Sequence, residues 1–149
     1  MLKVGEVAPP FAAGSTTGAP VSLEVMRGRI LVLYFFHRAF THKCTIETKG
    51  FRDNYPDLRA VGAEVIGVSS DDFGRQCEFA RFHDVNFPMI ADADHAIQRD
   101  YRVRFAFLAR RVTYVIDPRG IVAGVFHHEF QISKHLDEVL LFVRSMARP

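Results

Sequence analysis

The sequence has no tryptophan, only two cysteines and no long apolar run. Its longest continuous apolar segment, residues 30–36, is much shorter than the ~18 residues that a membrane-spanning helix requires. Residues 1–6 form no apolar secretory core. We therefore expect a cytoplasmic protein with no membrane partner. In that reducing compartment, two cysteines that pair do so transiently during catalysis rather than as a permanent structural link.

An excess of charge of either sign is also lacking. The formal net charge is +2, and the basic residues are scattered among acidic ones. This balance gives no support for a nucleic-acid partner. The adjacent histidines His127 and His128 are expected to point to opposite faces of a strand, and no second cluster has metal-ligand spacing. We therefore expect neither a bound metal nor another cofactor.

The chain shows an alternation of apolar, strand-like runs with helical patterns. A lead-in over residues 1–29 contains a small hairpin, and Pro56 is expected to kink the first helix or to end its first part. The expected strands cover residues 30–36, 63–69, 87–91, 112–116 and 121–126. Four helices are expected: one that begins near residue 43, one over residues 73–83, a brief one that ends near residue 99, and one over residues 132–146. This order predicts a single α/β domain over residues 1–149, built as a three-layer sandwich around a central mixed sheet.

Cys44 occupies the most informative position of the chain, because a buried strand ends, a polar loop follows, and the cysteine lies where a helix should begin. At such a position, backbone N–H groups and the helix dipole favour the thiolate, the reactive form of cysteine. The hydroxyl of Thr41, three residues earlier, can hydrogen-bond the thiolate or orient a substrate. The alternative interpretation is a small buried hydrophobic residue, which the polar neighbours His42 and Lys43 make less natural.

The rest of the sequence limits the kinds of reaction that the Cys44 thiol can catalyse. The lack of a Cys-x-x-Cys pair argues against disulfide exchange of the thioredoxin type. A protease-like pairing of Cys44 with one of the seven histidines stays open, although no histidine lies in a recognisable protease signature. Arg111 precedes the strand 112–116, and a guanidinium directed at Cys44 would stabilise the thiolate and bind an oxygen-rich substrate. Equally, Arg111 can be a solvated residue at a strand edge.

Together these residues resemble a known family. The segment Thr41-His42-Lys43-Cys44, with Glu47 three residues later, resembles the peroxidatic motif of the peroxiredoxins. Further segments resemble the bacterioferritin comigratory protein (PrxQ) branch, in the same order and over nearly the whole chain: residues 5–11, 51–53, 87–92 and 111–120. The resemblance implies a thioredoxin-like fold and a thiol-dependent peroxidase that reduces hydrogen peroxide and organic hydroperoxides to water and alcohols.

The resemblance also implies roles for single residues. Cys44 is the peroxidatic cysteine, which attacks the distal oxygen of a hydroperoxide and becomes a sulfenic acid. Thr41 and Arg111 match the residues that hold the thiolate and the peroxide oxygens, and Glu47 matches a position that helps to fix the arginine. One departure is His37, which stands where the family motif begins with a proline that shields the cysteine from water. His37 can fill that space, add a positive charge or leave the pocket more open.

The sulfenic acid must be resolved before further oxidation destroys it. Many members of the branch carry the resolving cysteine five residues after the peroxidatic one, where this chain has Lys49. Another subset places it in the helix that begins near residue 73. The resemblance therefore favours Cys77 and an intramolecular Cys44–Cys77 disulfide, which thioredoxin or a similar dithiol reduces. Because a disulfide needs Cα atoms within about 7 Å, we expect one or both helix starts to unwind during turnover.

Helix geometry bears on the exposure of Cys77. At about 100° per residue, Cys77 shares a face with Phe73 and Ala80, whereas Phe79 and Phe82 lie well round the other side. We expect these two bulkier residues to face the core and Cys77 to lie at the surface or in a shallow groove. A buried structural cysteine is the alternative.

Two further functional interpretations stay open. One is a one-cysteine peroxidase in which an outside thiol resolves the sulfenic acid. The other is a redox-responsive binding protein on the same fold, in which oxidation of Cys44 changes partners without efficient turnover. The resemblance is compatible with a monomer and with a homodimer.

Overall fold

The computed structural model describes residues 1–147. Its centre is a five-stranded sheet of order β5-β4-β3-β8-β9, in which β3, β4 and β5 are parallel while β8 and β9 run antiparallel to their neighbours. The strands are β1 (Ala12–Gly14), β2 (Pro20–Ser22), β3 (Ile30–Phe35), β4 (Ala63–Ser69), β5 (Met89–Ala91), β6 (Arg104–Phe105), β7 (Leu108–Ala109), β8 (Val112–Ile116) and β9 (Val122–His127), and the helices are α1 (His42–Ala60), α2 (Phe73–Phe82), α3 (Ala96–Asp100) and α4 (Ile132–Met146). The predicted mixed sheet is confirmed.

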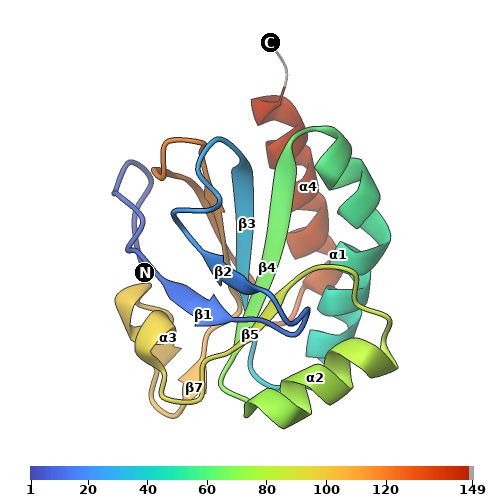
Figure 1. The fold of residues 1–149 in the computed structure, drawn as a ribbon. Helices are drawn as coiled ribbons and strands as arrows, with labels where there is room; N and C mark the ends of the chain where they lie inside the picture. The colour runs from blue at the N-terminus through green and yellow to red at the C-terminus, as the bar shows by residue number, and fades with distance from the viewer. Residues whose placement is uncertain (148–149) are drawn as a thin grey trace.

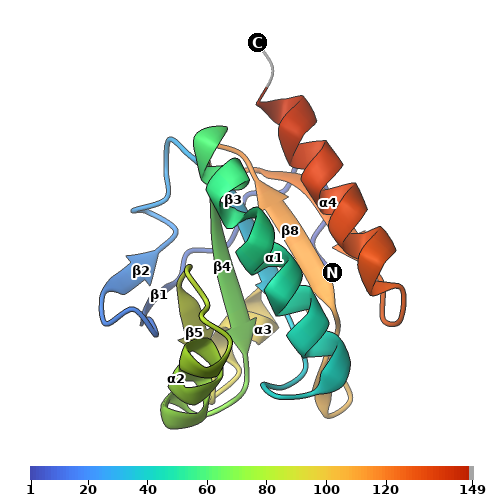
Figure 2. The ribbon, with the colours of Figure 1, turned by 90° about the vertical axis from the view of Figure 1, so that its right-hand side faces the viewer.

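The helices and the small hairpin complete three layers. Helices α1, α2 and α4 cover one face of the sheet (Figure 2), where they contact β4, β5 and β9 respectively. Helix α3 and the hairpin β1–β2 lie on the other face (Figure 1). The predicted three-layer sandwich is therefore confirmed. No helix within residues 1–147 is both long enough and apolar enough to cross a bilayer.

The central strand β3 is buried on both faces and separates two hydrophobic cores. Because successive side chains of a strand point to opposite faces, Val32 and Tyr34 join the core beneath α1 and α4. Leu31 and Leu33 join the core beneath the hairpin and α3. This double burial explains why the sequence of β3 is continuously apolar rather than alternating.

Helix α1 continues through Pro56 to Ala60, so the expectation that Pro56 ends its first part is wrong. A proline has no N–H and cannot donate to the carbonyl four residues earlier, which here belongs to Arg52. The side-chain amide of Asn86 donates to that carbonyl instead, at 3.3 Å. A partner from outside the helix thus occupies the acceptor that Pro56 leaves open.

Most other elements lie where the sequence places them. The expected strands 63–69 and 112–116 and the expected helix 132–146 coincide with β4, β8 and α4. The hairpin β6–β7 was not expected. Each of its strands has two residues, too few for an alternating pattern, and Ala106 between them has a left-handed φ of 55°.

Candidate active site

Sheet topology brings distant segments of the chain to one edge. Strand β3 ends there and leads through a loop into α1. Because β8 runs antiparallel to β3 with Phe35 opposite Val112, Arg111 arrives at the same edge. Strand β9 runs antiparallel to β8 with His127 opposite Val112, so the following loop and the start of α4 return to it as well.

Cys44 is the third residue of α1 and is buried, with 1% of its surface exposed. Thr41 is the N-cap residue, and its carbonyl accepts a hydrogen bond from the Thr45 N–H at 2.9 Å. The Thr41 hydroxyl is exposed and donates to the Arg38 carbonyl at 2.9 Å rather than to Cys44. The helix start therefore holds the thiol as the sequence predicts, while the hydroxyl of Thr41 faces the preceding loop.

The Arg111 side chain is buried and joins two groups of α1. Its Nη2 donates to Cys44 Sγ at 3.5 Å, and its Nη1 donates to Glu47 Oε1 at 2.8 Å. Burial by itself lowers the pKa of Arg111, but Glu47 and Cys44 together raise it above its ordinary value. The guanidinium thus keeps its charge, and the alternative of a solvated arginine at a strand edge is wrong.

Glu47 is fully buried beside this guanidinium. Burial, with a smaller contribution from the charge of Glu129, raises the pKa of Glu47 to about 7 against the opposing effect of Arg111. Oε2 of Glu47 has no hydrogen-bond partner among the described residues, and His135 Nε2 lies 3.5 Å from it. One oxygen of Glu47 is therefore occupied by Arg111, while the other faces α4.

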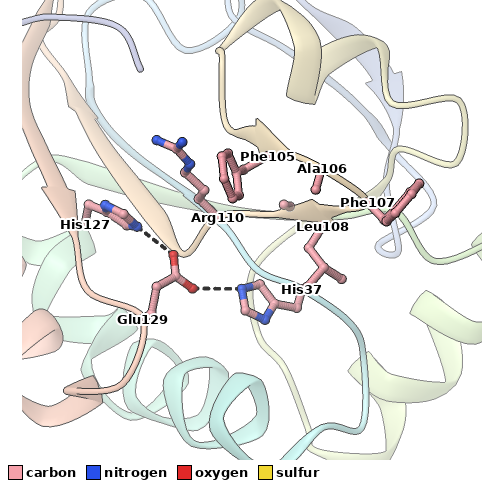
Figure 3. A pocket seen from close by; sticks show the side chains of 9 residues that line it. His37, Phe105, Ala106, Phe107, Leu108, Arg110, His127 and Glu129 are labelled. Atoms are coloured by element: carbon pink, nitrogen blue, oxygen red, sulfur yellow. Dashed lines mark hydrogen bonds and ion pairs between the residues drawn. The ribbon is translucent and has the colours of Figure 1, made fainter.

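Glu129 lies between this buried site and an open pocket. Its Oε1 lies 3.0 Å from His37 Nε2, and its Oε2 lies 2.6 Å from His127 Nε2, as Figure 3 shows. Oε2 also accepts the main-chain N–H of Arg111 at 3.0 Å. Burial opposes ionisation of Glu129, but the hydrogen bonds from His127 and Arg111 lower its pKa below the ordinary value.

The pocket in Figure 3 has a volume of about 580 Å³ and lies next to Glu129. One wall is apolar and comes from the β6–β7 hairpin, mainly Phe105, Phe107 and Leu108. His37 lines it from the end of β3 and is half-buried. The His37 side chain turns to Glu129 and forms part of the pocket wall.

Cys77 of α2 does not line the pocket in Figure 3. It is half-buried and lines a second hollow of about 410 Å³, together with Thr17 and Arg81. The expectation of a shallow groove is confirmed, and Phe79 is buried as expected. Phe82 is 73% exposed, so its expected core position is wrong. It is the last residue of α2 and packs at the surface against Phe40. Both thiols are free.

Sequence reasoning missed two residues of the site, Glu129 and His135. His135 is fully buried in α4, at an apolar-face position between Ile132 and Val139. The sequence could have indicated His135, because a titratable residue on the apolar face of an amphipathic helix is unusual. Glu129 follows a strand and gave no comparable signal. No group of three or more metal-ligating side chains is placed to hold an ion within residues 1–147.

Comparison with known proteins gives a consistent result. Residues 4–125 match the AhpC/TSA family. The chain is 34% identical to chloroplastic peroxiredoxin Q of Sedum lineare over 145 residues, which cover 95% of this chain and 78% of that protein. It is 36% identical to chloroplastic peroxiredoxin Q of Arabidopsis thaliana over 144 residues, 95% of this chain and 67% of that protein.

Two solved structures extend the comparison to the fold. Peroxidoxin BcpB of Mycobacterium tuberculosis superposes over all of both chains with a TM-score of 0.91 and 30% identity. Peroxiredoxin Q of Xanthomonas campestris covers 99% of this chain and 98% of its own, with a TM-score of 0.86 and 25% identity. The expected thioredoxin-like fold is confirmed.

Proposed function

Because the chain belongs to the AhpC/TSA family and is a peroxiredoxin, an oxidoreductase that acts on peroxide, we propose that Cys44 is its attacking thiol. The observation that carries the proposal is the buried contact between Arg111 Nη2 and Cys44 Sγ at the start of α1. A guanidinium in this position stabilises a thiolate and can donate to the oxygens of a bound peroxide. Glu47 holds the same guanidinium from its other side.

In the first step, the Cys44 thiolate attacks the distal oxygen of a hydroperoxide. The S–O bond forms as the O–O bond breaks, and the leaving hydroxide or alkoxide takes up a proton to give water or an alcohol. Cys44 becomes a sulfenic acid. Arg111 orients the two oxygens for in-line displacement, and the hydroxyl of Thr41 turns from Arg38 to the reacting atoms once the peroxide is bound.

The second step is resolution by Cys77. Its thiol attacks the sulfenic sulfur of Cys44, an S–S bond forms, and the sulfenic oxygen leaves as water. Thioredoxin or a similar cytoplasmic dithiol then reduces the disulfide by thiol exchange. Cys77 is the only other thiol of the sequence, and its partial exposure leaves it accessible.

Resolution requires movement, because Cys44 is buried in α1 while Cys77 lines a separate hollow. The loop before α1 is suited to it. Phe40 adopts a left-handed φ of 66°, a conformation that costs a non-glycine residue free energy. Its ring packs edge-on against Phe79 of α2, with ring centroids 5.2 Å apart. Unwinding of the first turn of α1 therefore displaces a side chain that packs on the helix of Cys77.

The pocket beside Glu129 supports organic hydroperoxides as a substrate class. Its apolar wall, which includes Phe105, Phe107 and Leu108, fits the organic group of an alkyl or aryl hydroperoxide. Hydrogen peroxide makes no use of such a wall. We therefore include organic hydroperoxides with hydrogen peroxide among the substrates.

The test is the intact mass of the protein after one equivalent of hydrogen peroxide. The wild type should lose two hydrogens, and Cys77→Ser should gain one oxygen that a sulfenic-acid reagent traps at Cys44. Cys44→Ser is the matched control and should not change. With thioredoxin and its reductase, only the wild type should turn over steadily.

The other outcomes identify the alternatives. Steady turnover of Cys77→Ser with an added thiol would identify a one-cysteine peroxidase. The absence of any rapid mass change at Cys44 would contradict the proposal. It would favour the redox-responsive binding protein, in keeping with the burial of the Cys44 thiol.

A further inference from the structure

A line of titratable side chains leads from Glu47 to the surface of the protein. It begins at Oε2 of Glu47, a fully buried carboxylate oxygen without a hydrogen-bond partner among the described residues. His135 Nε2 faces this oxygen across 3.5 Å. That separation is a few tenths of an ångström longer than a hydrogen bond, so a small approach of the two side chains closes it.

The line continues through a second histidine. His135 Nδ1 lies 3.0 Å from His128 Nδ1, and His128 Nε2 lies 3.2 Å from Glu138 Oε2. His135 Nε2 is also 2.7 Å from the hydroxyl of Thr113. Side-chain exposure rises along the line, from zero at His135 through 17% at His128 to 40% at Glu138. The line thus connects the buried carboxyl with solvent.

Protons can be arranged along this line in two ways, and only the outward arrangement also places a proton between His128 Nε2 and Glu138. In the inward arrangement, His128 Nδ1–H donates to His135 Nδ1, and His135 Nε2–H faces the Glu47 carboxylate. In the outward arrangement, His135 Nδ1–H donates to His128 Nδ1, His128 Nε2–H donates to Glu138, and the Thr113 hydroxyl donates to His135 Nε2. Each arrangement uses one proton per imidazole, as neutral histidines require.

Conversion of one arrangement into the other carries a proton. A solvent proton, taken up beside Glu138, binds His128 Nε2; the Nδ1 proton of His128 passes to His135 Nδ1, and the Nε2 proton of His135 passes to Glu47 Oε2. The products are a neutral Glu47 and the outward arrangement. The net change is one proton moved from solvent to Glu47, and the reverse sequence returns it.

We propose that His135 and His128 relay protons between Glu138 at the surface and Glu47 beside Arg111, so that Glu47 exchanges its charge with solvent while it stays buried. His135 and His128 are positioning residues in this scheme, since neither contacts the thiol. The effect of the relay on catalysis rests on the roles proposed for Cys44 and Arg111, whereas the relay itself does not.

The electrostatic surroundings agree with this geometry. Burial raises the pKa of Glu47 to about 7, so both of its charge states are populated near neutral pH. Burial, the charge of His128 and the charge of Arg111 lower the pKa of His135 to about 3, so its imidazole is neutral and accepts a proton on one nitrogen as it gives one up from the other. The titratable and charged groups that act on the Glu47–His135 pair are Tyr34 of β3, Arg111 before β8, His127 of β9, and His128 and Glu129 of the following loop. Cys44 of α1 acts on the pair's neighbours Arg111 and Tyr34.

The charge of Glu47 determines how Arg111 is shared. An ionised Glu47 neutralises the guanidinium at Nη1, 2.8 Å away. A protonated Glu47 leaves the positive charge to Cys44 and to a bound peroxide. Removal of an Nε2–H donor from position 135 should raise the pKa of Glu47, because that donor stabilises the carboxylate.

The test observes Glu47 directly, by ¹³C NMR of the reduced protein with labelled glutamate carboxyl carbons between pH 5 and 9. The Glu47 signal is identified by its loss in Glu47→Gln. In the wild type it should titrate near neutral pH as one signal averaged by rapid exchange. His128→Phe leaves the surroundings of Glu47 intact, and separate signals of the two charge states should appear. His135→Phe should give the same slow exchange and raise the midpoint by about one pH unit.

His83→Phe is the matched control, because His83 lies on another part of the surface near Phe40 and should leave the titration unchanged. A Glu47 signal that stays averaged in His128→Phe would overturn the relay, even where His135→Phe fails to fold. A Glu47 that does not titrate in this range would overturn it as well.

A parallel pH profile of the rate of Cys44 oxidation separates the relay from the proposed function. A rate that follows the Glu47 titration in the wild type, and shifts with it in His135→Phe, supports both. A titration that behaves as expected, with no peroxide reaction at any pH, leaves the relay standing and contradicts the role of Cys44.

Discussion

Arg111 donates two hydrogen bonds to Glu129, one from its main chain and one from its side chain. The main-chain N–H of Arg111 donates to Glu129 Oε2 at 3.0 Å, and Arg111 Nε donates to the main-chain carbonyl of Glu129 at 3.4 Å. These bonds fix the plane of the guanidinium, and its two remaining nitrogens reach Glu47 and Cys44. Each nitrogen of the side chain thus has its own partner, a pattern that a lysine cannot reproduce.

Arg111→Lys should therefore slow the oxidation of Cys44 although the charge is retained. We expect the second-order rate constant with hydrogen peroxide to fall by about 10²-fold or more, the cost of removing one preorganised donor. Rapid mixing of the reduced protein with peroxide measures it. Arg110→Lys is the control, since the Arg110 guanidinium lies over the Phe105 ring at 4.8 Å. Equal rates for the wild type and Arg111→Lys would contradict the role given to Arg111.

Thr41→Val removes a hydroxyl that donates to the Arg38 carbonyl in the structure. If that hydroxyl turns to the peroxide during the reaction, Thr41→Val should lower the rate constant by about 10²-fold. Thr41→Ser retains the hydroxyl and should stay within a few-fold of the wild type. Thr41 makes no side-chain cap to α1, so the thermal midpoint should change little. A loss of stability with an unchanged rate would identify a purely structural residue.

Phe107→Ser should change substrate preference. The Phe107 side chain is 92% exposed at the pocket, so its loss should not destabilise the fold. Loss of roughly 1 kcal/mol of apolar contact corresponds to about a fivefold lower rate constant with cumene hydroperoxide. The rate constant with hydrogen peroxide should stay the same. Leu141→Ser, exposed on α4, is the matched control. A parallel loss with both peroxides would show that Phe107 acts on the thiol rather than on the organic group.

The stability of the protein should depend on pH through Glu47. Its folded pKa of about 7 lies above the ordinary value of 4.5, so the folded state holds a proton that the unfolded chain has lost. This contribution is fully present below about pH 4.5 and is lost as the pH rises through 7. The difference amounts to about 3 kcal/mol.

Urea unfolding of the wild type and Glu47→Gln at pH 4.5 and 8 measures this effect. The free energy of unfolding of the wild type should fall by about 3 kcal/mol more than that of Glu47→Gln between these pH values. Parallel pH dependence of the two proteins would mean that Glu47 is ionised throughout the range.

Local patterns in the sequence predicted much of the fold and the centre of the site. The continuous apolar run of β3 and the polar loop after it placed Cys44 at a helix start, and Glu47 follows one turn later on the same helix. Arg111 was identified by its position before β8 and by the family resemblance. These features depend on neighbours in the chain, and the structure shows them where they were expected.

The remaining features depend on contacts between distant segments. The partner that Asn86 provides to the Arg52 carbonyl, and hence the continuity of α1 through Pro56, has no local signature. The contacts of Glu129 with His37 and Arg111 likewise arise only when β9 returns to the edge where β3 ends. The periodicity of the sequence marks Asn86 and Glu129 as polar positions but does not indicate which residues they contact.

The contact between Cys44 and Arg111 joins residues 67 positions apart and exists only after β3 and β8 have paired. During synthesis, a chain that has passed residue 44 but not residue 111 carries its cysteine without the neighbouring cation. Such a nascent chain lacks the guanidinium contact on which the proposed role of Cys44 depends. On the role proposed for Cys44, rapid reaction with peroxide therefore begins only when the tertiary structure is complete.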